Sequence, residues 1–190
     1  MIINDGSTDD TSAICHRRGY HIIDHPENMG LAAAFHTGMK YAYDNGYRYC
    51  VQFDGDGQHR AEFVRPMKEK MDEGYDIVIA SRFIHAKKPL SMRMIGSNLI
   101  EAAIRARTGV DIKDPTSGMR MYSEKMIREF ALHLNYPPEP STLAYLIRCD
   151  GAKVAEVPAV MDERTAGTSY LSPGKAVVYM GKVLGDILRK

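Results

Sequence analysis

Short apolar segments alternate with helix-forming segments through the first 82 residues of this 190-residue chain. The expected strands cover residues 1–4, 21–24, 48–54 and 76–82, and the expected helices cover residues 8–18, 31–45 and 61–73. This alternation predicts an α/β fold: a mainly parallel sheet with helices on both faces and right-handed crossovers.

The second half of the chain is less regular. We expect helices at residues 93–107, 124–132, 142–148 and 174–189 and an edge strand at 153–158, and we assign no regular element to residues 111–122. The last helix carries one apolar face, formed by Val177, Met180, Leu184, Ile187 and Leu188. Such a helix either packs on the domain, which is the commoner outcome and the one we favour, or lies on an anionic membrane surface.

Composition narrows the class of protein. Hydrophobic residues make up 44% and charged residues 26%, which is typical of one soluble globular domain. The net charge of +1, with no basic run interleaved with aromatic residues, gives no reason to expect nucleic acid as a partner. Three widely spaced cysteines favour neither a disulfide scaffold nor a zinc site, and fit a reducing cytoplasm. We expect no membrane-spanning helix and no signal peptide.

The strongest chemical signal follows the strand at residues 48–54. That strand runs into Asp54-Gly55-Asp56-Gly57-Gln58-His59, which places two carboxylates at its carboxyl end. Open α/β sheets bind their ligands at this edge, and hard oxygen ligands suit Mg²⁺ or Mn²⁺. The alternative is a solvated loop whose acidic residues cap the next helix. For His59 we consider two interpretations equally: it is a metal ligand, or it forms hydrogen bonds within the loop.

Five segments in this order resemble those of family 2 glycosyltransferases. Within that family the chain is most similar to the branch of dolichol- and polyprenyl-phosphate sugar transferases. The resemblance covers nearly the whole chain, and the segments are Ile3-Asn-Asp-Gly-Ser-Thr-Asp9, Asn28-Met-Gly-Leu31, Asp54-Gly-Asp-Gly-Gln-His59, Asp114-Pro-Thr-Ser-Gly-Met-Arg120 and Glu163-Arg-Thr-Ala-Gly-Thr-Ser169.

The resemblance implies a GT-A-type fold and a UDP- or GDP-linked sugar donor. The positions it assigns to nucleotide binding are Asp5, Gly6, Ser7, Asn28, Gly30 and Asp54. Asp5 matches the carboxylate that accepts hydrogen bonds from the base, although it has an alternative role as the cap of the helix beginning near Thr8. Asn4 stands where the family often has a second aspartate, and an amide can still pair with a base edge.

The resemblance also implies sites for a metal and for the donor diphosphate. Asp54, Asp56 and Gln58 match the set that holds Mg²⁺ or Mn²⁺, which would neutralise charge on the leaving diphosphate. Arg164 and Ser169 match a segment that covers the diphosphate, and the alternative there is a surface turn.

The role of Asp114 depends on the acceptor. A glycan hydroxyl needs a general base, and Asp114 is the matching catalytic candidate. A lipid phosphate is already anionic near neutral pH, so Arg82, Ser117 and Arg120 would hold it while Asp114 orients them. A third possibility is a structural turn ahead of Pro115.

Members of the family normally begin with a strand and loop ahead of the Asp-Gly-Ser segment, and this chain lacks that first βα unit. We therefore expect either a fragment of a longer protein or a partner segment or subunit that fills the gap. The domain expected is one GT-A domain over residues 1–190, with a nucleotide and metal part at about 1–82 and an acceptor part at about 83–190.

These observations together predict an inverting, metal-dependent hexosyltransferase. Its acceptor would be a polyprenyl or dolichyl phosphate or a glycan, and its location the cytoplasm, at the inner face of the membrane. Two alternatives stay open: a noncatalytic nucleotide-sugar-binding or assembly module, and a nucleotidyltransferase on a similar sheet.

Overall fold

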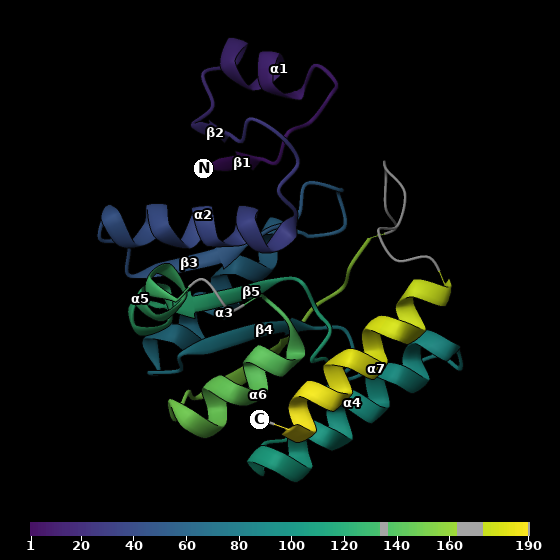
Figure 1. Ribbon diagram of the computed structural model, residues 1–190. Helices are drawn as coiled ribbons and strands as arrows, with labels where there is room; N and C mark the ends of the chain where they lie inside the picture. Colours follow the sequence, from purple (N-terminus) through teal and green to yellow (C-terminus); the bar gives the residue numbers. More distant parts are fainter. Residues whose placement is uncertain (134–136, 163–172, 190) are drawn as a thin grey trace. The chain divides into compact units, whose positions relative to one another are not determined.

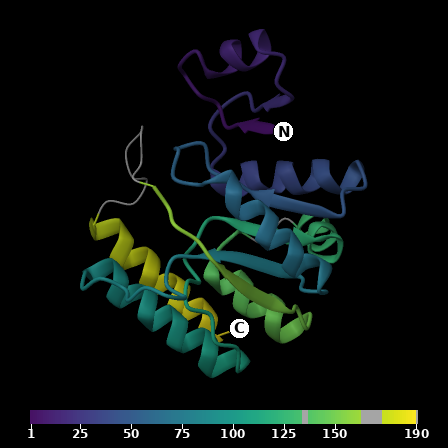
Figure 2. The same ribbon diagram turned by 180° about the vertical axis from the view of Figure 1, so that it is seen from behind.

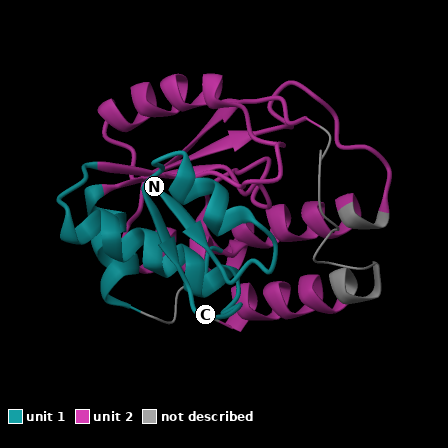
Figure 3. Ribbon diagram, turned by 90° about the horizontal axis from the view of Figure 1, so that it is seen from above, with its two compact units in different colours: residues 1–48, 124–138 teal, residues 49–123, 139–190 magenta. Residues whose placement is uncertain are grey.

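The computed structural model describes residues 1–133, 137–162 and 173–189 (Figure 1). The chain divides into two compact units, which Figure 3 shows in different colours. One unit consists of residues 1–48 and 124–138, and the other of residues 49–123 and 139–190.

The first unit is built on two short parallel strands, β1 (Ile2–Asn4) and β2 (Ile22–Asp24), with Ile3 opposite Ile23. Its helices are α1 (Thr11–Arg17), α2 (Leu31–Asp44) and α5 (Glu124–Leu132). Helices α2 and α5 pack together, and the rings of Phe35 and Phe130 meet edge to face with centroids 4.9 Å apart. The second half of the chain therefore returns to cover the helix that the first half provides.

A four-stranded sheet forms the centre of the second unit, in the order β3, β5, β4, β6. Strands β3 (Tyr49–Gln52), β4 (Ile77–Ser81) and β6 (Val154–Pro158) run in the same direction, and β5 (Arg120–Ser123) runs against them between β3 and β4. The sheet is thus mainly parallel, as predicted, and β6 is an edge strand. Strand β5, which begins within residues 111–122, was not assigned from the sequence.

Both faces of the sheet's central strand β4 are buried. Helix α3 (Val64–Asp72), preceded by a short 3-10 turn η1 (Ala61–Phe63), packs on one face, where Met67 and Met71 join a core cluster with Val78 and Ala80. Side chains alternate along a strand, so Ile77 and Ile79 point to the other face, and they too are buried. The predicted covering of both faces is present.

Helices α4 (Met92–Thr108), α6 (Pro140–Cys149) and α7 (Pro173–Arg189) pack against one another in the second unit, and Figures 1 and 2 both show α4 and α7 side by side. The predicted packing of the last helix on the domain is confirmed. Among the side chains of this helix that the structure describes, Val183 and Ile187 are buried, whereas Leu188 is exposed, contrary to the expected face. The side chain of Val177 lies outside the described residues. No helix in the described part of the chain is long and apolar enough to cross a membrane.

The reversed direction of β5 brings several loops of the second unit to one edge of its sheet. Arg120, the first residue of β5, lies opposite Gln52 near the end of β3 and opposite Ile79 on β4. The loop before β5 therefore meets the loops that follow β3 and β4. Ala159, directly after β6, donates its backbone N–H to the Ser81 carbonyl at the same edge.

Candidate active site

His59 shapes the acidic loop that follows β3. The backbone N–H of Asp54 donates to His59 Nδ1 at 2.9 Å, so the proton of the neutral ring is on Nε2, which lies 3.8 Å from Asp54 Oδ2. The ring is buried, and burial lowers the pKa of His59, outweighing the neighbouring carboxylates that would raise it. Of the two roles left open for His59, the structure supports hydrogen bonding within the loop.

Gln58 connects this loop to the segment that follows β6. Its backbone N–H donates to Asp56 Oδ1 at 3.1 Å, and its side-chain amide donates to the Asp162 carbonyl at 3.3 Å. The Asp162 N–H returns a bond to the Gln58 carbonyl, and the Arg60 fork grips the Asp162 carboxylate through Nε and Nη2. The segment carrying Asp162 is thus tied to the loop with the predicted metal ligands.

Gly118 brings a second loop against Asp54. A Cβ atom on Gly118 would lie 2.9 Å from Asp54 Oδ2 and 3.6 Å from the His59 ring. Only a residue without a side chain allows this close approach without displacing the carboxylate. The loop that begins at Asp114 therefore lies directly beside the acidic loop that contains Asp54.

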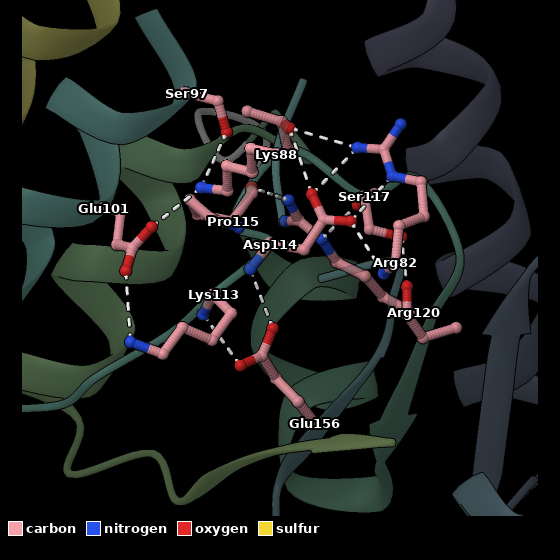
Figure 4. Close-up of polar contacts among 12 residues, drawn as sticks. Arg82, Lys88, Ser97, Glu101, Lys113, Asp114, Pro115, Ser117, Arg120 and Glu156 are labelled. Carbon is pink, nitrogen blue, oxygen red and sulfur yellow. Dashed lines mark hydrogen bonds and ion pairs between the residues drawn. The ribbon is translucent and has the colours of Figure 1, made fainter. Parts of the chain in front are cut away.

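Arg82 donates most of the hydrogen bonds that the Asp114 carboxylate accepts (Figure 4). Its Nε donates to Oδ2 at 2.7 Å, its Nη2 to Oδ1 at 2.8 Å, and its backbone N–H to Oδ2 at 3.1 Å, while Thr116 donates its hydroxyl to Oδ1 at 3.2 Å. Burial by itself would raise the pKa of Asp114, but the hydrogen bonds and charge of Arg82 outweigh it and the pKa is lowered. Asp114 is fully buried, and the Arg82 side chain is 25% exposed.

Ser117 and Arg120 hold the loop in place through hydrogen bonds to backbone carbonyls. The Ser117 hydroxyl donates to the Ala80 carbonyl at 2.6 Å, and Arg120 donates from Nε to the Ser117 carbonyl and from Nη2 to the Pro115 carbonyl. Both side chains are buried. The predicted contact of Ser117 and Arg120 with an acceptor stays a prediction. The structural turn that was considered for Asp114 is present, because the Ser117 N–H donates to the Asp114 carbonyl.

Asp5 is the centre of a separate set of contacts in the first unit. Its Oδ1 accepts from the Met29 N–H at 2.9 Å and lies 2.8 Å from His25 Nδ1, and its Oδ2 accepts from the Gly30 N–H at 2.8 Å. The other ring nitrogen of His25 lies 2.9 Å from the Thr37 hydroxyl. The alternative role of Asp5 as the cap of the first helix was wrong, because its carboxylate bonds the residues that lead into α2.

A cavity of about 570 Å³ lies between the loops that follow β1 and β2. Of the residues predicted to bind the nucleotide, Gly6, Ser7 and Asn28 line it, whereas Asp5, Gly30 and Asp54 are not among its lining residues. Gly6 has a φ of +66°, and a Cβ there would lie 2.3 Å from the backbone carbon of Glu27. The close approach of the two loops therefore requires glycine at position 6.

The predicted metal ligands Asp54, Asp56 and Gln58 stay a prediction. The described residues contain no group of three or more His, Cys, Asp and Glu side chains that could hold an ion, and one oxygen of Asp56 accepts the Gln58 N–H. Mg²⁺ is commonly bound by one or two carboxylates together with substrate phosphates, and that is the arrangement the prediction needs. Arg164 and Ser169 lie outside the described residues.

Two residues with central contacts received no role from the sequence. His25 bonds the predicted Asp5, and Glu156 on β6 bonds the backbone at Asp114. Position 25 follows a strand directly, which is a usable signal for a site residue. Glu156 lies in the apolar context Val-Ala-Glu-Val-Pro, where a charged residue reads as the solvent face of an edge strand.

Comparison with known proteins identifies the family of the chain. The sequence profile of glycosyl transferase family 2 matches residues 1–131. Polyprenol monophosphomannose synthase of Mycolicibacterium smegmatis is 26% identical over 200 residues, which cover 96% of this chain and 74% of the relative. Undecaprenyl-phosphate mannosyltransferase of Micrococcus luteus is 27% identical over 187 residues, which cover 92% and 76%.

Solved structures share the fold. Glucosyl-3-phosphoglycerate synthase of Mycobacterium tuberculosis, in complex with Mn²⁺ and UDP-glucose, superposes with a TM-score of 0.65 at 18% identity, over 100% of this chain and 66% of that one. A mycobacterial protein with the same TM-score is covered over 62% of its length. The fold is the GT-A-type α/β fold, and the relatives support the polyprenyl-phosphate sugar transferase branch. By its family profile and these relatives, the chain belongs to glycosyl transferase family 2, a family of sugar-transferring enzymes.

Proposed function

We propose that the protein transfers a hexose from a UDP- or GDP-linked sugar to a polyprenyl phosphate, by a single displacement that inverts the anomeric carbon. Polyprenol monophosphomannose and undecaprenyl phosphate stand in the names of two relatives that match more than nine tenths of the chain. The donor class is supported by the UDP-glucose complex of a protein with the same fold. The acceptor is the point on which this chain's own contacts bear most directly.

The state of Asp114 is the observation that carries the proposal. A general base must accept a proton readily, yet both oxygens of this carboxylate already accept hydrogen bonds and its pKa is lowered. Asp114 is therefore poorly suited to activate a sugar hydroxyl. A phosphate monoester needs no such activation, because its second pKa is about 6 and it is mostly a dianion at neutral pH.

The Arg82 guanidinium is the group at this loop that an anionic acceptor would meet. Asp114 and Arg82 carry opposite charges. The positive charge of Arg120 is offset by the nearby carboxylates of Glu156 and Asp54, so these groups together have no net positive charge. The Arg82 side chain is 25% exposed, and a guanidinium of this kind can donate hydrogen bonds to phosphate oxygens.

Asp54 and Asp56 would hold a Mg²⁺ or Mn²⁺ ion at the edge of the sheet. Such an ion, when bound, neutralises charge on the leaving diphosphate. His59 holds the backbone of Asp54, and Gln58 links this loop to the segment before Arg164. A lipid acceptor places the reaction at a membrane surface, so we propose peripheral contact with the cytoplasmic face of the membrane.

Radiolabelled transfer assays test the proposal. UDP-glucose and GDP-mannose, each with Mn²⁺, are offered together with a short-chain polyprenyl monophosphate or with the corresponding polyprenol. We expect label on the phosphate and none on the alcohol, with activity falling below about pH 6 as the acceptor takes up its second proton. Transfer to the alcohol, or an acid limb well below pH 5, would contradict it.

Removing the metal with a chelator tests the metal dependence independently of the choice of acceptor. EDTA should abolish transfer, and added Mn²⁺ should restore it. Asp56→Asn is expected to raise the Mn²⁺ concentration needed for half-maximal activity, while Asp44→Asn, an exposed carboxylate that pairs with Lys40 on α2, leaves that concentration unchanged. Full activity in EDTA would remove the metal from the proposal and leave the choice of acceptor standing.

A further inference from the structure

Glu156 holds the backbone of the Asp114 loop with both oxygens of its carboxylate. Oε2 accepts from the Lys113 N–H at 2.7 Å, and Oε1 accepts from the Asp114 N–H at 2.8 Å (Figure 4). Two consecutive amides therefore point at one carboxylate. Hydrogen bonds to an ionised acceptor are shorter and about twice as strong as those between neutral groups.

The position of Glu156 in the sheet makes this contact rigid. Glu156 lies on β6 opposite Ile79 of β4, and Ile79 precedes Arg82 by three residues. The strand that leads to Arg82 and the strand that carries Glu156 are thus direct neighbours. Asp114 is held at its backbone by one strand and at its carboxylate by the residue that follows the other.

The residue after Asp114 increases the importance of this contact. Pro115 has no N–H, so the amides of Lys113 and Asp114 are the last donors before the turn that presents Thr116 and Ser117. The Lys113 side chain does not share the task, since its Nζ pairs with Asp111 and Glu101. Within the structure as described, the backbone entering the turn is fixed by Glu156.

We propose that Glu156 is a positioning residue for the acceptor subsite, acting through the backbone of Asp114 on the orientation of Arg82. This inference rests on the proposed transfer to a lipid phosphate for its kinetic consequence, but its structural part does not. Without the clamp the Asp114 carboxylate shifts, and the Arg82 guanidinium that it holds shifts with it. The part of the loop that meets Asp54 is Gly118, and it is held next to Ser117 by bonds that do not involve Glu156, so donor binding stays unchanged.

The substitution Glu156→Gln tests this with little change of shape. A glutamine offers one oxygen acceptor, and its NH₂ group would face an N–H, so one of the two amides loses its partner. We expect the KM for short-chain polyprenyl monophosphate to rise about tenfold, the size expected for one charge-assisted bond, with the KM for the donor unchanged. Asp111→Asn is the matched control, because it removes a carboxylate beside Lys113 without touching either amide.

Nuclear magnetic resonance gives a readout that needs no activity. In the ¹⁵N–¹H spectrum the amide protons of Lys113 and Asp114 should move upfield in Glu156→Gln and stay in place in Asp111→Asn. Unchanged amide shifts in Glu156→Gln would overturn the inference whatever the enzyme does. Moved amides with an unchanged acceptor KM in a working enzyme would overturn the positioning role. If the parent protein transfers no sugar at all, the proposed function fails while the amide shifts still decide the clamp.

Discussion

Asp5 and Asp114 both lie in loops at the ends of strands, and both use their two oxygens as hydrogen-bond acceptors, but their partners differ. Asp5 bonds two backbone amides and the ring of His25, and its side chain is 20% exposed. Asp114 is fully buried and bonds chiefly the guanidinium of Arg82. The first carboxylate fixes the path of a loop, whereas the second holds a cation in place. A lowered pKa is common to both, so the pKa alone does not tell a structural aspartate from one in a charged site.

The largest expected effect comes from removing the cation of the buried pair. Arg82→Leu leaves the Asp114 carboxylate buried without its charged partner, which should lower the free energy of unfolding by about 3–5 kcal/mol. Urea denaturation at pH 7 measures this. Arg82→Lys, which keeps the charge but loses the planar fork, should lose less. A loss under about 1 kcal/mol for Arg82→Leu would mean that water reaches Asp114.

The same pair predicts a direction with pH. Because the pKa of folded Asp114 lies below the usual 3.8, its pairing stabilises the parent protein above about pH 4. That contribution is lost as the pH falls through the lowered folded pKa. The stability gap between the parent and Arg82→Leu should therefore narrow in acid, as measured by urea denaturation from pH 7 to pH 3. A gap that widens in acid would contradict the assignment.

Alanine substitutions at two glycines, one in each loop region, should lower stability by an intermediate amount and test the two loops against each other. Gly6→Ala combines a left-handed backbone with a clash against the backbone of Glu27, and should lower the free energy of unfolding by about 3 kcal/mol. Gly118→Ala meets the end of the Asp54 side chain, which can turn away. We expect a smaller loss of stability there but weaker Mn²⁺ binding, measured by calorimetry. Equal stability losses would show that Asp54 cannot move.

The smallest effect is expected at Asp5. Asp5→Asn keeps the shape but replaces one acceptor oxygen by an NH₂ group, so the bond from Met29 or from Gly30 is lost at a cost of about 1–2 kcal/mol. Amide hydrogen exchange should speed up at these two residues, with Met39 in the middle of α2 as the internal reference. Unchanged exchange would place the stability of this loop in other contacts.

The alternation of strands and helices was predictable because it is local. Each apolar run of the first 82 residues became an element within a few residues of its expected bounds, and α5 matches its expected bounds. Strand β5 was missed for a physical reason. Four residues beginning with Arg120 have no pattern of their own, and they form a strand only because β3 and β4 lie on either side.

The candidate site was predictable as a set of residue types but not as a set of contacts. The sequence indicates Asp54, Asp114 and Arg82, yet which carboxylate Arg82 neutralises depends on strand order. The role of Glu156 was beyond reach for the same reason, since its partners lie 42 and 43 residues away in the chain. His59 was left between two roles, and the tautomer fixed by the Asp54 amide favours one of them.

The antiparallel course of β5 has a practical consequence for engineering. Residues 110–119 leave helix α4 at Gly109 and enter β5 at Arg120, so this stretch is an excursion with both ends attached to the scaffold. A replacement of similar length that keeps the proline, the small residue at 118 and the two anchoring amides should be accepted by the remaining scaffold. If the acceptor binds at this loop as we propose, grafting residues 110–119 from other members of the family should exchange the acceptor preference while residues 1–82 are left as they are.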